Sequence, residues 1–106
     1  MRALELRDLA TAQADGESLY HEFLRVPALS LGLYVLPVGS TDPQHPHNED
    51  EVYYVTQGRA TISVDGEDRL VQAGSIVYVA AQVEHRFHHI EDDLHLLVFF
   101  APAESK

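Results

Sequence analysis

Residues 39–58 carry the most structural information in this chain and read Gly39-Ser-Thr-Asp-Pro-Gln-His45-Pro-His47-Asn-Glu-Asp-Glu51-Val-Tyr-Tyr-Val-Thr-Gln-Gly58. Side chains alternate in an extended chain, so His45 and His47 can point the same way. Glu51 comes an even number of residues after His47 and can return to that face. Two imidazoles and a carboxylate that converge form half of a metal shell and leave other coordination positions open.

A fourth ligand is offered by His85, which follows the Asp65-Gly66 hairpin signal and a turn at Gly74. A chain that doubles back in this way can bring a later strand beside an earlier one. Glu49 has the same parity as Glu51 and is the rival carboxylate. The alternative to a metal site is a polar surface loop, with His85 as a buried, hydrogen-bonded histidine.

The spacing of these residues resembles the first signature of the cupin superfamily. That signature is Gly, five residues, His-x-His, three or four residues, Glu, six residues and Gly. Every fixed position is met, by Gly39, His45, His47, Glu51 and Gly58. With Gly at about 7% of residues and the other types rarer still, so many matches do not arise easily by chance.

The second cupin signature is matched in part. It reads Gly, five residues, Pro-x-Gly, two residues, His, three residues and Asn, and Gly74 and His85 stand at the right spacing. Ala80 replaces the Pro, Gln82 the Gly and His89 the Asn. In the family these three positions shape turns and do not bind the metal, so the departures concern the local turn more than the site.

The resemblance implies an all-β chain with a cupin-type double-stranded β-helix, also called a jelly-roll barrel. It spans about Leu31 to Pro102, and we expect one domain over residues 1–106 with the barrel core at about 19–102. The structure of the N-terminal segment 1–18 is left open. The resemblance also implies one metal site, whose ligands are His45, His47, Glu51 and His85.

The hydrophobic pattern agrees with an all-β fold. Short β-runs bounded by turn residues predict eight or nine strands at about 8–12-residue spacing, which is typical of a sandwich or barrel. A polar loop at 40–50 and a turn at Gln57-Gly58 separate some of them, and only the first fifteen or so residues could support a short helix. The runs are 19–26, 31–38, 51–56, 60–64, 69–71, 76–81, 84–90 and 94–100.

Composition excludes several classes of partner. The chain has 106 residues, a formal net charge of −10 and no basic stripe, so nucleic acid and anionic membranes are poor partners. Cys is absent, which excludes disulfides and thiolate metal sites. No apolar signal-peptide region and no membrane-spanning run are visible, so we expect a cytoplasmic protein.

Four residues are candidates for the wall of a substrate pocket. Tyr53 and Val55 have the parity of Glu51, and Phe87 and His89 have that of His85, so all four can face the barrel interior. For Tyr53, Val55 and Phe87 the alternative is ordinary core packing. For His89 it is a turn residue that fills the Asn position.

Three imidazoles and one carboxylate suit a divalent transition metal, one per chain, with Fe or Mn favoured and Ni, Co, Zn and Cu as alternatives. The resemblance implies a metal-dependent, dioxygenase-like oxidoreductase acting on a small organic molecule, although no catalytic residue is identified. The alternatives are a non-catalytic ligand-binding module and a metal-dependent isomerase or lyase. A phosphosugar substrate ranks lower because few Lys or Arg residues are available. Apolar residues on both strand faces predict a homodimer.

Overall fold

The computed structural model describes residues 1–14 and 19–105, and antiparallel strands dominate it. Its elements are α1 (Leu6–Ala14), β1 (Tyr20–Val26), β2 (Leu29–Leu36), β3 (Asp50–Val64), β4 (Glu67–Gln72), β5 (Ile76–Val79) and β6 (His85–Ala101). The N-terminal segment, whose structure the sequence left open, contains the short helix α1, while residues 15–18 lie outside the described residues. Among the described residues no helix is long and apolar enough to cross a bilayer.

The predicted turn at Gln57-Gly58 is wrong, because β3 continues through it. The pairing of β3 with β6 is irregular between Val55 and Thr61, and Gly58 has a positive φ of 97°. A Cβ at Gly58 would collide with the backbone of Asp93, so the two strands approach closely at this bend. Irregular positions of this kind redirect a strand without reversing it. The predicted strands at 51–56 and 60–64 are therefore one strand.

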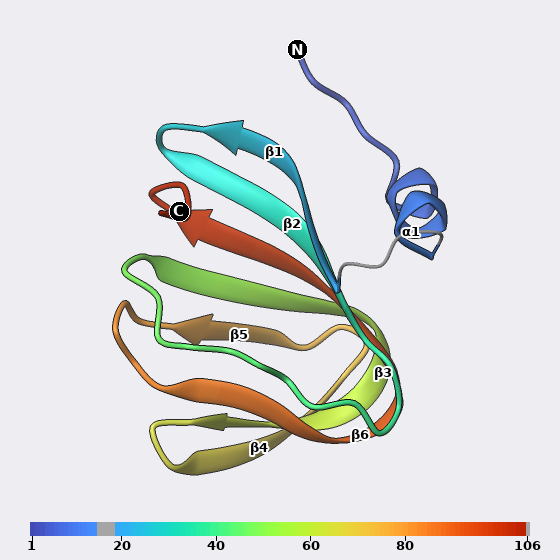
Figure 1. The fold of residues 1–106 in the computed structure, drawn as a ribbon, viewed down its shortest axis with the longest axis vertical. Coiled ribbons are helices and arrows are strands. Elements are labelled where there is room, and N and C mark those ends of the chain that lie inside the picture. The colour runs from blue at the N-terminus through green and yellow to red at the C-terminus, as the bar shows by residue number, and fades with distance from the viewer. Residues whose placement is uncertain (15–18, 106) are drawn as a thin grey trace.

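The same correction applies to β6, which joins the predicted strands at 84–90 and 94–100. The expected eight or nine short strands become six in the described part of the chain, two of them long and bent. Because β3 and β6 bend, one hydrogen-bonded sheet of order β1-β2-β6-β3-β4, with β5 also paired to β3, folds into two layers (Figure 1). The first half of β3 lies between β5 and the end of β6, and its second half lies between β4 and the start of β6.

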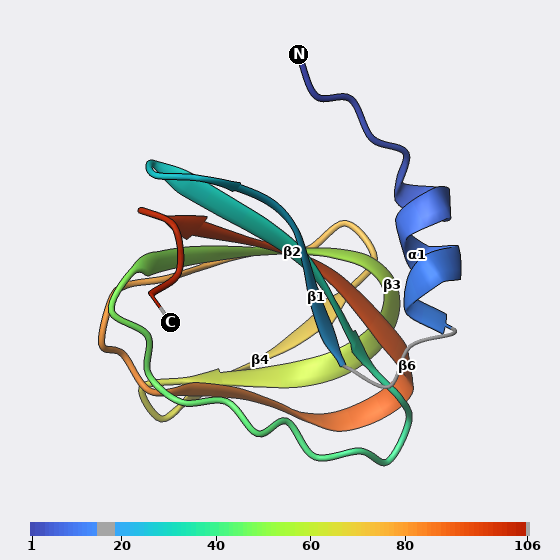
Figure 2. The same ribbon diagram turned by 45° about the horizontal axis from the view of Figure 1, so that its top comes forward.

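The space between the two layers is filled by inward side chains of β2 to β6, and the partly buried Tyr20 of β1 packs against them. Along β3 the alternation places Glu51, Tyr53 and Val55 on the inner face, where all three are buried. Helix α1 stands outside the barrel beside β2 (Figures 1 and 2). The buried core consists of Tyr34, Leu36, Tyr53, Val55, Ala60, Ile62, Val71, Val79, Phe87, Ile90, Leu94, Leu96, Val98 and Phe100.

The polar loop between β2 and β3 crosses one side of the barrel before it enters β3 (Figure 2). Asp42, which is 3% exposed, fastens this loop to the core because its carboxylate accepts hydrogen bonds from the Phe87 backbone N–H and the Tyr34 hydroxyl. The His47 carbonyl accepts a second anchoring bond from the Gln82 N–H, at 2.7 Å. The loop is thus held against the side of the barrel.

Candidate metal centre

Three of the four predicted ligands lie together. His47, Glu51 and His85 each bring one ligand atom into a group whose members lie within 4.8 Å of one another. Glu51 Oε1 is 3.1 Å from His85 Nε2 and 3.9 Å from His47 Nε2. His47 comes from the loop before β3, Glu51 from the start of β3 and His85 from the start of β6. The fold therefore joins residues that are far apart in sequence at one end of the barrel.

Each imidazole of the group is oriented by a contact of its Nδ1 atom, the ring nitrogen on the side away from Glu51. His85 Nδ1 lies 2.9 Å from the Val83 carbonyl, an acceptor, so this nitrogen carries the proton. His47 Nδ1 lies 3.4 Å from a carboxylate oxygen of Glu104, which is also an acceptor. In a neutral imidazole the second nitrogen then has a free lone pair. Partners of this kind are typical of histidines that bind metal through Nε2.

The electrostatics of the group fit a bound cation. Glu51 Oε1 is buried and, in the described part of the chain, accepts no hydrogen bond. Burial lowers the pKa of His85, but Glu51, the Val83 carbonyl and Asp42 together outweigh this, and the pKa is raised above its ordinary value. The site thus favours positive charge. Two imidazole lone pairs and a buried carboxylate form a donor set that suits a divalent transition metal.

The fourth predicted ligand, His45, is exposed and is not a member of this group. The amide oxygen of Gln44 lies beside the group in place of the His45 ring, 3.3 Å from His47 Nε2 and 3.2 Å from His85 Nε2. Sequence reasoning missed Gln44 because it assumed strand-like alternation, whereas the segment from Pro43 to Pro46 is irregular. The flanking prolines were the available signal that alternation would fail there.

The rival carboxylate, Glu49, does not join the group either. Its side chain is buried, at 6% exposed, but one carboxylate oxygen accepts a hydrogen bond from the Ser105 N–H at 3.1 Å. The same tail is fastened by the Glu104 N–H, which donates to Ser30 Oγ at 2.9 Å. Glu49 therefore holds the C-terminal tail against the barrel, and this brings Glu104 to His47.

A cavity of about 330 Å³ opens beside the group, which is within the range of small-molecule sites. It combines aromatic and aliphatic walls with the imidazoles of His45 and His47, the carboxylates of Glu51 and Glu104, and the amide of Gln44. Of the four predicted pocket residues, Tyr53 lines this cavity. The lining residues are Leu19, Tyr20, Tyr34, Pro43, Gln44, His45, His47, Glu51, Tyr53, Val98, Phe100 and Glu104.

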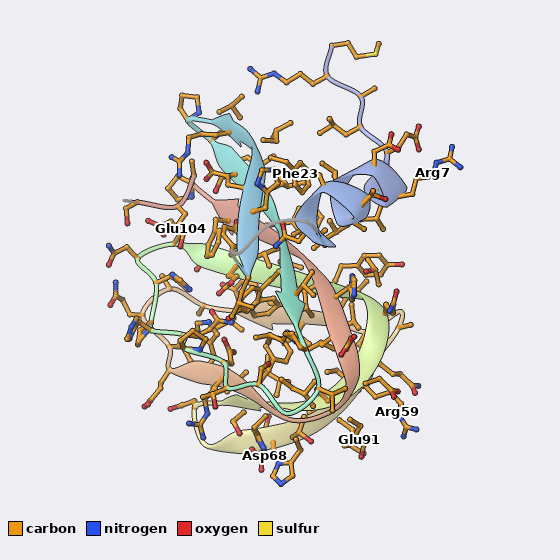
Figure 3. All side chains as sticks on the ribbon, turned by 45° about the vertical axis from the view of Figure 1, so that its right-hand side comes forward. Arg7, Phe23, Arg59, Asp68, Glu91 and Glu104 are labelled. Atoms are coloured by element: carbon orange, nitrogen blue, oxygen red, sulfur yellow. The ribbon has the colours of Figure 1, made fainter. Side chains whose placement is uncertain are left out.

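The other three predicted pocket residues lie elsewhere. Val55 and Phe87 are packed in the core, with Phe87 in an edge-to-face contact with Tyr53. His89 is exposed, because a positive φ of 50° at this residue breaks the alternation of β6 and turns Ile90 inward instead. His88 beside it contacts Asp68 and Ser63 on the outer surface, at the part of the barrel where Figure 3 labels Asp68.

Comparison with known proteins agrees with this architecture. The family described as "Cupin domain" matches residues 32–101. An uncharacterized protein of Streptomyces coelicolor is 50% identical over 105 residues, which cover 99% of this chain and 100% of that protein. The solved structure of KdgF from Halomonas sp. superposes with a TM-score of 0.72 at 23% identity, over 78% of this chain and 76% of that one. An RmlC-like cupin family protein of Methanocaldococcus jannaschii, with a double-stranded β-helix fold, gives 0.72 at 26% identity over 83% and 84%.

Proposed function

The chain belongs to the cupin family, with the predicted double-stranded β-helix fold, and on that premise we propose that it is a divalent-metal-dependent enzyme acting on a small organic molecule. The observation that carries the proposal is the meeting of His47, Glu51 and His85 beside a cavity. Two histidines and one carboxylate with open positions are typical of non-haem iron oxygenases, so dioxygenase-like chemistry is favoured.

The metal would be held by these three residues, one ion per chain. Fe or Mn is favoured, and Ni, Co, Zn and Cu are alternatives that the same donor set accepts. When bound, such an ion supplies Lewis-acid chemistry and, if it is redox-active, exchange of electrons with substrate and oxygen. Glu104 and the Val83 carbonyl keep the two Nε2 atoms turned toward Glu51, which is the orientation that ligation requires.

The cavity walls indicate the class of substrate. Among the described residues that line the cavity there is no Lys or Arg, while Glu51 and Glu104 contribute carboxylates. A phosphorylated or polyanionic substrate is therefore disfavoured, and a neutral or cationic molecule is favoured. Leu19, Val98 and Phe100 supply apolar surface that excludes water from one side of a bound molecule. We expect a small, partly apolar compound with a group that can approach the metal.

A metal-dependent isomerase or lyase is the second candidate, and Tyr53 favours it. Its hydroxyl lies at the site, 3.0 Å from Gln44 Oε1. Burial first, and then Glu51, raises the pKa of Tyr53 well above its ordinary value. The hydroxyl therefore stays protonated near neutral pH and can donate a hydrogen bond to a substrate oxygen in place of the Gln44 oxygen. Oxygen consumption separates this candidate from the first.

The decisive experiment measures oxygen uptake by the Fe(II)-loaded protein with a panel of small carbonyl, phenolic and thiol compounds. We expect uptake coupled to a product, lost in His85→Ala and kept in His21→Ala, an exposed histidine on β1 that serves as the matched control. Product without oxygen uptake would favour the isomerase or lyase. Ligand binding without turnover would reduce the protein to a binding module, and a protein that takes up no metal would contradict the proposal itself.

We also propose that the chain forms a homodimer through the outer face of β3, β5 and β6. Tyr54, Ile76 and Tyr78 are 39%, 71% and 60% exposed, and cross-strand pairing places half-buried Leu97 and Phe99 on the same face. A contiguous uncharged patch on a chain of net charge −10 suits a second copy of itself. Light scattering should give a dimer for the native chain and a monomer for Ile76→Asp, and a monomeric native chain at micromolar concentration would contradict this.

A further inference from the structure

The amide oxygen of Gln44 lies where a fourth metal ligand would be. It is 3.3 Å from His47 Nε2 and 3.2 Å from His85 Nε2, and His85 Nε2 is 3.1 Å from Glu51 Oε1. With metal–ligand bonds of about 2.0–2.2 Å, neighbouring ligand atoms of a tetrahedral or octahedral shell lie about 3–3.5 Å apart. Gln44 Oε1 therefore has the separations of a ligand from both imidazoles.

Each of these atoms has a lone pair that can face a bound ion. Because His85 and His47 use Nδ1 toward the Val83 carbonyl and Glu104, each neutral ring presents only an acceptor to Gln44 Oε1. Glu51 Oε1 adds a further buried acceptor without a hydrogen bond in the described part of the chain. Gln44 Oε1 accepts a hydrogen bond from the Tyr53 hydroxyl at 3.0 Å and keeps a second lone pair, so a cation placed between these four atoms would be stabilised by all of them.

Asp42 determines which end of the Gln44 amide faces the site. Gln44 Nε2 donates to Asp42 Oδ2 at 3.1 Å, and a carboxylate can only accept, so Oε1 must point the other way. The Phe87 N–H donates to the same Asp42 oxygen at 2.9 Å, and the Tyr34 hydroxyl donates to the other oxygen. This buried network fastens the amide of Gln44 to the barrel core, so its oxygen needs no rearrangement to bind an ion.

His45 is placed differently. Its side chain is exposed, and it borders both the cavity beside the metal group and a second cavity lined by Asp42, Pro46 and His85 among others. No residue network comparable to that of Asp42 turns its ring toward His85 in the described structure. The family signature would make His45 a ligand, whereas the geometry gives that place to its neighbour.

We propose that Gln44, and not His45, supplies the fourth protein ligand, and that Asp42 is its positioning residue. This rests on the proposed metal site. The shell would then contain two imidazole nitrogens and two oxygens, one from Glu51 and one from the amide. Replacing an imidazole ligand by a carbonyl oxygen shifts the metal preference of the site toward Mn(II) and Fe(II) and away from Cu(II) and Zn(II).

The test compares Co²⁺ affinity in variants of the full chain, measured by calorimetry and by the visible absorption of bound cobalt. Gln44→Ala should lose about tenfold or more, and Asp42→Asn should lose affinity in the same direction, since partners of ligands typically contribute about 10–100-fold. Gln44→Glu keeps an oxygen ligand and should keep the metal. His45→Ala should stay within about twofold of the native chain, like the exposed control His21→Ala.

X-ray absorption of the cobalt-loaded native chain gives an independent readout, because it counts coordinated imidazoles. Two imidazoles are expected, and three would overturn the proposal. A loss in His45→Ala as large as in Gln44→Ala would also overturn it, as would native affinity in Gln44→Ala. Circular dichroism and melting of each variant separate loss of the ligand from loss of the fold, and Gln44→Glu keeps the test decisive if Gln44→Ala unfolds. A native chain that binds no Co²⁺, Mn²⁺ or Fe²⁺ would instead remove the metal site itself.

Discussion

Glu104 Oε2 lies 3.4 Å from His47 Nδ1, so the C-terminal tail contacts a ring of the metal group directly. Figure 3 shows Glu104 on this tail, well away from Arg59 and Glu91. The tail is held by the Ser105 N–H, which donates to Glu49, and by Arg25, which donates to the Glu104 carbonyl at 2.5 Å. A residue two positions before Lys106 thereby orients a ligand in the loop before β3.

Replacing Glu104 should weaken metal binding without unfolding the chain. In Glu104→Ala the His47 ring loses the acceptor of its Nδ1 proton, and we expect affinity for Mn²⁺ to fall about tenfold. Glu91→Ala removes an exposed carboxylate of β6 that pairs with Arg59, and it should leave the affinity unchanged. Calorimetric titration of both variants checks this. Equal affinities would show that the contact does not orient His47.

Removing the metal should lower the melting temperature. An ion that binds only the folded chain contributes about 4 kcal/mol at a free concentration of 1,000 times Kd. We expect a chelator to lower the melting temperature of the native chain, and expect little effect of chelator on His47→Ala or His85→Ala. Differential scanning calorimetry with and without chelator measures both. A native chain whose melting does not respond to chelator after metal loading would contradict the proposed site.

Restoring a family residue in the second signature should stabilise the fold. His89, which stands at the family's Asn position, has a left-handed backbone with φ of 50°, a conformation that Asn adopts more readily than His. We expect His89→Asn to raise the free energy of unfolding by about 0.5–1 kcal/mol. His21→Asn, on exposed β1, is the control and should not stabilise. Urea unfolding gives both values, and a destabilised His89→Asn would show that its contact with His88 matters more.

A related expectation concerns Gln82, which stands at the family's Gly position and has φ of 69°. The chain keeps the left-handed turn that the family makes with glycine, since the Gln82 N–H still bonds to the His47 carbonyl. Gln82→Gly should relieve the backbone while it loses the side-chain bond to Asn48 Oδ1. The increase in the free energy of unfolding should therefore be smaller for Gln82→Gly than for His89→Asn. The same urea experiment ranks the two variants.

Alkaline pH should unfold the protein through its buried tyrosines. Burial is the largest cause that raises the pKa values of Tyr20, Tyr34 and Tyr53 above the ordinary 10.0, so all three stay protonated while the chain is folded. Their stabilising contribution is complete below pH 10.0 and is lost as the pH rises above it, because the unfolded chain then ionises first.

The measurement is absorbance at the phenolate band together with circular dichroism. Exposed Tyr78, whose pKa is raised by burial and then by Asp50, should ionise while the fold is intact. The phenolate absorbance of Tyr20, Tyr34 and Tyr53 should appear only with the loss of β-structure. Ionisation of all five tyrosines before unfolding would show that the cavity admits hydroxide freely.

The sequence alone predicted the all-β class, the barrel and the family, because hydrophobic alternation and the fixed spacing of Gly39, His47, Glu51 and Gly58 are local properties of the chain. It also predicted that Tyr53 faces the site. It failed where a backbone bend replaces a turn, as at Gly58, since a glycine with positive φ serves either purpose and only the long-range pairing of β3 with β6 distinguishes them.

Only the tertiary structure decided which residues of the loop face the site. Alternation holds in a paired strand, but the segment from Pro43 to Pro46 has no strand partner, so its side-chain directions follow from distant contacts. Asp42 binds the Phe87 N–H across the barrel and turns Gln44 inward, and the C-terminal tail brings Glu104 to His47. The contacts of Asp42 with Phe87 and of His47 with Glu104 join segments more than forty residues apart, and no spacing rule within the loop encodes them.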